Sequence, residues 1–239
     1  MGPGSDVRAY LITSGGEPDP TCADAWVVDA RSAPSSSRAG GEAIRGQGAD
    51  IAALNGFASL AMTRGISGKR TVPLLIRIEG IDAIDRDELA EVRPDAIMLS
   101  SAHGRDIAHL GAQLAVHEAE HGLPDGGIGI IALVVSAAGV LATASFAGAS
   151  PRLRGIGWDA ALASELGAEP LTDEGDWSPV LAQARAMARL AASAAGVAAI
   201  EAAYPGKDPR KVIGAARRDG FAAMFARDAR QAQAIRGES

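Results

Sequence analysis

Short apolar runs bounded by turn residues recur along the chain, and stretches with helical periodicity lie between them. This alternation is typical of β-α units built around a parallel sheet. Eight runs are predicted as strands: 8–13, 25–29, 72–78, 96–99, 128–135, 153–156, 197–201 and 221–225. The run that begins at Ile128 is apolar throughout, as expected when helices cover one face of a strand and a filled barrel interior covers the other. The pattern predicts an α/β fold of one (β/α)8 TIM barrel.

The stretches between the strands carry recognisable helix ends. Ser178 and Asp208, each followed by a proline, are N-terminal signals, whereas Gly122 and Gly220 are C-terminal stops. The predicted helices are 48–64, 86–92, 104–121, 137–146, 160–166, 178–195, 209–218 and 228–236. The polar segment 33–48 has no apolar period and follows the second strand, so it is predicted as a loop on the face where barrels build their active sites.

The length of 239 residues and the 47% content of hydrophobic residues suit one barrel domain. Residues 1–5 resemble the remnant of an expression tag, which leaves 6–239 as that domain. The longest apolar runs fall short of the roughly 20 residues that a membrane span needs, or are broken by Gly and Ser. We therefore expect no membrane partner.

A formal charge of −6 argues against nucleic acid, since a phosphate backbone is bound by a basic face. Small molecules or proteins are the expected partners. Cys22 is the one cysteine, so the chain can form no internal disulfide, and a reducing, cytoplasmic location is predicted.

Residues 117–121 satisfy the H-E-x-x-H pattern of zinc hydrolases. This pattern falls in a crossover helix whose apolar face, with Ile107, Leu110 and Leu114, should pack on the sheet. We expect His117, Glu118 and His121 on the solvated side of that helix, without a metal.

Two glycine-rich segments invite a phosphate-loop interpretation. The glycines at 126–129 precede a strand, whereas phosphate-binding glycines follow a strand and open a helix, so a tight turn is predicted there. Gly155 and Gly157 lie at the end of a predicted strand, where either a turn or a close approach to a ligand would account for them.

Charged residues at the carboxyl ends of barrel strands project into the barrel mouth, and five such residues are predicted: Asp29, Arg31, Arg77, Glu79 and Glu201. An arginine in that place can bind a substrate carboxylate through two parallel hydrogen bonds. Arg77 is the leading candidate. The alternative is that it forms an internal ion pair with Glu79 or Asp29.

Read together, these segments resemble the citrate lyase beta subunit and HpcH/HpaI aldolase family over nearly the whole chain. Residues 23–29 resemble its A-D-A-x-x-x-D-L-E-D segment, and residues 76–78 resemble its V-R-I-N strand. Further similar segments are 8–11, 93–99, 138–141, 197–204 and 220–231. The resemblance implies a TIM barrel, a homo-oligomer and a carbon-carbon lyase acting on an acyl-CoA or a 2-oxoacid, with Arg77 and Asp29 as site residues.

In that family a Glu of the fifth strand and an Asp after the sixth hold magnesium, which stabilises an enolate. Here Val135 and Ala161 align with these two ligands, and Asp159 could replace the second if the loop is shifted by two residues. Arg31 stands where the family has an acid, and Ser101 where it has a lysine. We therefore predict no metal at the family's position and leave the cofactor open. The alternative to a lyase is a catalytically degenerate barrel that binds an anionic metabolite or a partner protein.

Overall fold

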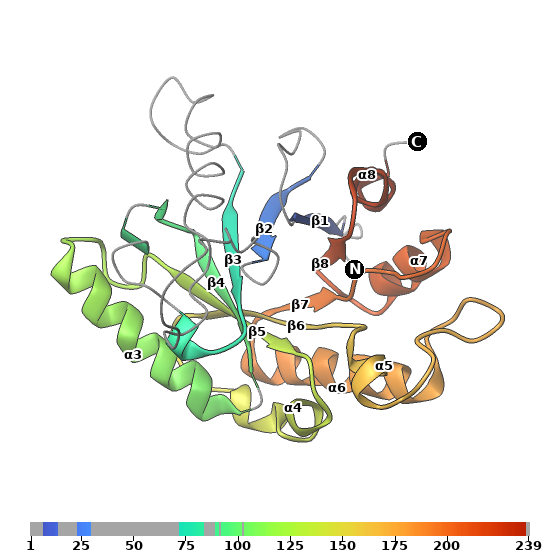
Figure 1. Cartoon of the computed structure of the whole chain (residues 1–239), viewed down its shortest axis with the longest axis horizontal. Coiled ribbons are helices and arrows are strands. Elements are labelled where there is room, and N and C mark those ends of the chain that lie inside the picture. Colours follow the sequence, from blue (N-terminus) through green and yellow to red (C-terminus); the bar gives the residue numbers. More distant parts are fainter. Residues whose placement is uncertain are drawn as a thin grey trace, which may run out of the picture.

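The computed structural model describes residues 7–13, 23–29, 72–83, 89–90, 92–101 and 103–237, and within them eight strands form a closed parallel barrel (Figure 1). The strands are β1 (Arg8–Thr13), β2 (Ala25–Asp29), β3 (Leu74–Ile78), β4 (Ala96–Ser100), β5 (Gly129–Val134), β6 (Leu153–Trp158), β7 (Ala198–Glu201) and β8 (Ala223–Ala226). Each strand pairs with its neighbour in the chain, and β1 also pairs with β8, which closes the ring. The predicted TIM barrel and its eight strands are confirmed.

Helices lie outside the ring of strands (Figure 1). The described ones are η2 (Ile81–Ala83), α3 (Gly104–Glu120), α4 (Ala137–Leu141), η3 (Thr143–Phe146), α5 (Leu162–Glu165), α6 (Pro179–Ala195), α7 (Arg210–Arg218) and α8 (Ala229–Arg236). The predicted helix 48–64, most of the helix 86–92, the loop 33–48 and Cys22 lie outside the described residues. Within the described ranges, no helix is long and apolar enough to cross a membrane.

Apolar side chains form two layers, one on each face of the strands. The outer layer lies between strands and helices and includes Leu74, Ile76 and Trp158. The inner layer fills the barrel, with Leu75 from β3 and Phe225 from β8 among its members. Because successive side chains of a strand point to opposite faces, each strand contributes to both layers.

The predicted turn at Gly155 and Gly157 is wrong, because both glycines lie within β6, which continues to Trp158; a contact with a ligand stays a prediction. A Cβ on Gly157 would lie 3.1 Å from the Phe225 ring, and one on Gly155 would lie 3.2 Å from Ile200. Both contacts are tighter than ordinary packing. The glycines make room for large side chains inside the barrel.

Three of the four predicted helix ends lie where expected, and the fourth is shifted by one residue. Gly122 and Gly220 have positive φ angles of 63° and 79°, which glycine adopts without steric cost. Ser178 is the N-cap of α6, but its hydroxyl makes no capping hydrogen bond. The N-cap of α7 is Pro209, one residue after the predicted Asp208.

Candidate active site at the barrel mouth

Arg77 extends from the inner face of β3, two residues after Leu75 of the inner layer. Its guanidinium Nη1 donates to the Asp159 carboxylate at 2.7 Å, and the Arg77 side chain is 4% exposed. Asp159 follows β6, and its second oxygen accepts from the Ala161 amide. We call Arg77 and Asp159 the mouth pair, since both lie where parallel strands end and barrels carry their active sites.

Two buried polar atoms at this end of the barrel, one of them in the mouth pair itself, have no hydrogen-bond partner among the described residues. They are Nε of Arg77 and Oγ of Ser100, the last residue of β4. β3 and β4 are adjacent, with Arg77 opposite Met98, so the two atoms come from neighbouring strand ends. A buried donor without a partner costs free energy unless a ligand or water satisfies it. The mouth therefore offers hydrogen-bonding capacity to a polar ligand.

The described ion-pair partner of Arg77 is Asp159, which was not one of the two predicted partners, Glu79 and Asp29. Asp29 ends β2 and lies opposite Arg77 in the strand register, but its side chain is outside the described residues, as is Arg31. The site role of Asp29 stays a prediction.

The expectation that Glu201 projects into the mouth is wrong. Its side chain is fully buried in the outer layer, where it accepts from Trp158 Nε1 at 2.8 Å and from Arg185 Nε of α6 at 2.5 Å. Arg185 continues the network to Asp219 at 2.7 Å and lies over the Phe221 ring. Glu201 thus ties β7 to helix α6, a structural role.

The expectation that the H-E-x-x-H helix presents its polar residues to solvent is wrong for two of the three. His117 and Glu118 are each 1% exposed, whereas His121 is exposed. Glu118 accepts from the amides of Gly126 and Ile128, both at 2.8 Å, and pairs with Arg152 at 2.7 Å. Its carboxylate is fully used in holding the loop before β5.

That loop is the glycine-rich segment 126–129. The Gly127 amide donates to the Pro124 carbonyl, and Gly126 has a positive φ of 75°, so the predicted tight turn is confirmed.

The donors that the structure describes at the mouth do not fit the family's magnesium. Val135, which continues the inner face of β5, packs against the inner layer and has no oxygen to offer. Ala161 has none either, and Asp159 is engaged by Arg77 and the Ala161 amide. In the described ranges no three acidic, histidine or cysteine side chains gather as metal ligands. Ser101, at the family's lysine position, donates to the His103 carbonyl.

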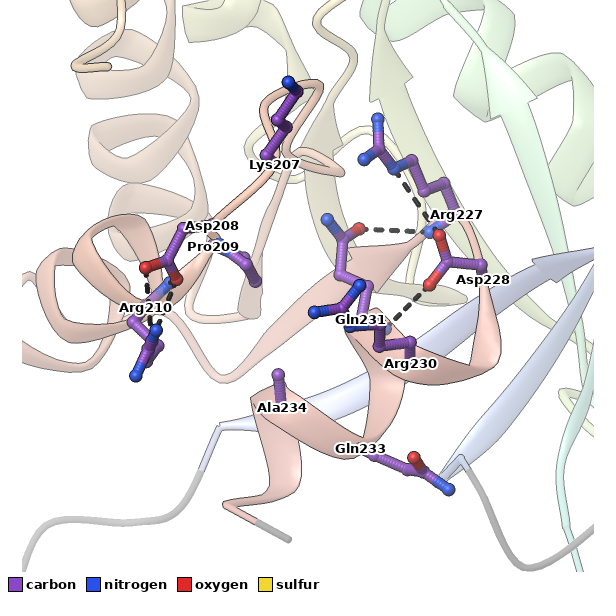
Figure 2. Close-up of a pocket in the computed structure, with 10 residues that line it drawn as sticks. All are labelled: Lys207, Asp208, Pro209, Arg210, Arg227, Asp228, Arg230, Gln231, Gln233 and Ala234. Carbon is purple, nitrogen blue, oxygen red and sulfur yellow. Dashed lines mark hydrogen bonds and ion pairs between the residues drawn. The ribbon is translucent and has the colours of Figure 1, made fainter. Parts of the chain in front are cut away.

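Sequence reasoning did not find a basic cavity of about 580 Å³ that lies between the segments after β7 and β8 (Figure 2). Arg and Lys residues are concentrated at 207–210 and 227–230, in the segments that follow the seventh and eighth strands. This concentration of basic residues could have predicted the cavity from the sequence.

No family model matches the chain, and no curated protein matches it. Solved structures do, over nearly its whole length. The citrate lyase beta subunit of M. tuberculosis, in complex with oxaloacetate and magnesium, has a TM-score of 0.67 at 20% identity over 98% of this chain and 97% of its own. RipC from Yersinia pestis has a TM-score of 0.67 at 23% identity, over 99% and 96% of the two chains.

Malate synthase from Haloferax volcanii has a TM-score of 0.72 at 16% identity, over 100% of this chain and 74% of its own. These likenesses confirm the fold that the sequence resemblance implied. At such low sequence identities a shared fold does not establish the function, which has to be inferred from the residues of the site.

Proposed function

We propose that the protein is a carbon-carbon lyase of the aldolase type that acts on a 2-oxoacid or an acyl-CoA. The observation that carries this proposal is the mouth pair, a buried guanidinium with an unpartnered Nε beside a carboxylate. Supporting it, similar structures are described as complexes with oxaloacetate and magnesium, and with magnesium, acetoacetate and coenzyme A.

Arg77 would bind the oxygen that becomes negative in the reaction. In cleavage of a β-hydroxy substrate, the hydroxyl loses its proton and the adjacent carbon-carbon bond breaks. The bonding electron pair then forms an enolate, which a fixed guanidinium in a water-poor site stabilises. Asp159, in contact with Arg77, is our candidate for the base that accepts the hydroxyl proton. Because Val135 and Ala161 offer no ligands, no step of this mechanism uses a metal.

The second candidate is a barrel that binds an anionic metabolite, or a partner protein, without turnover. The specific observation in its favour is that Asp159 already neutralises Arg77, while both aligned metal positions are apolar. A carboxylate ligand would then exchange with Asp159 for the same guanidinium.

An assay of cleavage with malyl-CoA, citramalyl-CoA, citryl-CoA and a 4-hydroxy-2-oxoacid separates the two functions. We expect turnover that Arg77→Ala abolishes, while Arg105→Ala on the exposed surface of α3 retains it. Calorimetric titration with oxaloacetate accompanies each assay. No turnover of any substrate, together with oxaloacetate binding that Arg77→Ala removes, would overturn the lyase and support the binding barrel.

The cytoplasmic location and the homo-oligomeric state stay predictions from the sequence. Gel filtration with light scattering measures the second directly.

A further inference from the structure

The basic cavity lies at the carboxyl ends of β7 and β8, on the same end of the barrel as Arg77. Its charged lining residues are Lys207, Asp208, Arg210, Arg227, Asp228 and Arg230 (Figure 2). The lining thus has four basic and two acidic side chains, whereas the whole chain has a formal charge of −6. A local positive surplus on an acidic protein favours an anionic ligand.

Both acids of the cavity are already bound by neighbouring groups. Asp208 accepts from the Arg210 Nε at 3.0 Å and from the Arg210 amide at 3.1 Å. Asp228 caps helix α8 by accepting from the Gln231 amide at 2.7 Å. These contacts weaken the repulsion that the two carboxylates would exert on an anion.

The basic side chains of the cavity differ in how many of their N–H donors already make hydrogen bonds within the protein. Arg227 donates to the carbonyls of Pro205 and Gly206 at 2.7 and 2.9 Å, which fixes the loop after β7, and its Nε also forms an ion pair with Asp228 at 3.6 Å. Lys207 and Arg230 are exposed and make no hydrogen bond or ion pair with the part of the chain that the structure describes. In Figure 2 Arg230 is drawn between the two loop segments. Its donors and those of Lys207 are available to a ligand.

Backbone amides contribute less here than in many anion sites. Asp228 already occupies the amide end of α8, and Pro209, at the start of α7, has no N–H. The positive ends of both helix dipoles still add to the field of the cations. Recognition must therefore come from the side chains.

We propose that this cavity binds a phosphoryl group. Phosphate groups frequently bind (β/α)8 barrels after the seventh and eighth strands, and guanidinium and ammonium groups are the usual partners of phosphate oxygens. A volume of about 580 Å³ suits a ligand larger than free phosphate. The phosphoryl group would belong either to the nucleotide end of a thioester substrate or to a free phosphorylated metabolite. The inference does not depend on lyase activity.

Isothermal titration of the full chain with inorganic phosphate, adenosine 3′,5′-bisphosphate and coenzyme A tests the proposal. The double variant Lys207→Ala/Arg230→Ala should weaken binding of the bisphosphate at least about tenfold, since each lost contact involves a charged donor. Arg105→Ala/Arg218→Ala is the matched control, because it removes two exposed cations outside the cavity and changes the net charge equally. Arg77→Ala should leave the bisphosphate affinity unchanged, which separates this proposal from the lyase.

If the bisphosphate and coenzyme A bind with similar affinity, and both bind much more tightly than inorganic phosphate, the ligand is the nucleotide end of a thioester. Inorganic phosphate binding as tightly as the bisphosphate identifies a free phosphorylated ligand. Absence of binding by all three probes overturns the proposal, and so does equal weakening in the cavity variant and the matched control.

Discussion

Strand β6 has a buried arginine-carboxylate contact at each end, and the two differ in how completely they are satisfied. Before β6, Arg152 joins Glu118 and Asp125 in what we call the floor cluster, at the amino end of the barrel. After β6, Asp159 joins Arg77 in the mouth pair. One strand thus allows a structural and a candidate functional contact to be compared.

The floor cluster is closed. Both oxygens of Glu118 accept backbone amides, and one also contacts Arg152. The mouth pair is open, since Arg77 makes one described hydrogen bond while its Nε has no partner, and Asp159 is 23% exposed. A charge held by many protein groups stabilises the fold, whereas a charge with unused donors can bind a ligand.

The largest expected effect follows from Glu118→Ala. The variant leaves the buried Ile128 amide without its acceptor and Arg152 with Asp125, which is 93% exposed, as its remaining ion-pair partner among the described residues. We expect a loss of about 3 kcal/mol in the free energy of unfolding. Urea denaturation followed by circular dichroism measures it. Glu169→Ala, on the exposed surface, should change stability by less than about 0.5 kcal/mol; equal losses would show that the floor cluster has no special role.

Asp159→Asn tests whether the mouth pair can bind a ligand. Asparagine keeps an acceptor for the Ala161 amide but removes the charge that competes with a bound carboxylate for Arg77. We expect the affinity for oxaloacetate to rise about tenfold, as the internal ion pair no longer opposes binding. Turnover, if Asp159 is the base, should fall at the same time.

The measurements for this variant are calorimetric titration and the lyase assay. Asp173→Asn, an exposed change of the same charge in the loop before α6, is the control. A fall in oxaloacetate affinity would instead mean that Asp159 contacts the ligand favourably.

The contrast also shows what the sequence could predict. Apolar runs predicted all eight strands, and Arg77 stood out because few residues at a strand end can bind a carboxylate. The contact with Asp159 joins residues 82 positions apart, and no local pattern encodes it.

Glu201 was misplaced because its strand, Ala-Ala-Ile-Glu, has too little polar contrast to show which face points inward. Glu118 was predictable. It lies four residues after Leu114 and so continues the buried stripe of α3.

A smaller effect is expected in the pH dependence of the stability that Glu118 gives to the floor cluster. Burial alone would raise the pKa of Glu118, but the hydrogen bonds from Arg152, Ile128 and Gly126 and the Arg152 charge hold it below its ordinary value of 4.5. A carboxyl group with a lowered pKa in the folded state stabilises fully above the unfolded pKa, and the stabilisation is lost as pH falls through the folded pKa.

The gap in unfolding free energy between wild type and Glu118→Gln should therefore be constant above about pH 5.5 and shrink below 4.5. Denaturation series at several pH values measure this gap. A gap that widens in acid would contradict the closed geometry.

The smallest effect concerns magnesium at the mouth. Isothermal titration of the wild type, with and without oxaloacetate, should show no stoichiometric magnesium binding, because Val135 supplies no oxygen and Asp159 is engaged by Arg77. Val135→Glu adds a carboxylate beside β6, and divalent cations prefer sites with more than one carboxylate or carbonyl oxygen. Weak magnesium binding should then appear, and Val135→Gln, which adds similar bulk without the charge, should lack it. Tight magnesium binding by the wild type would contradict the described contact between Arg77 and Asp159, since the cation would have to displace Arg77 from that carboxylate.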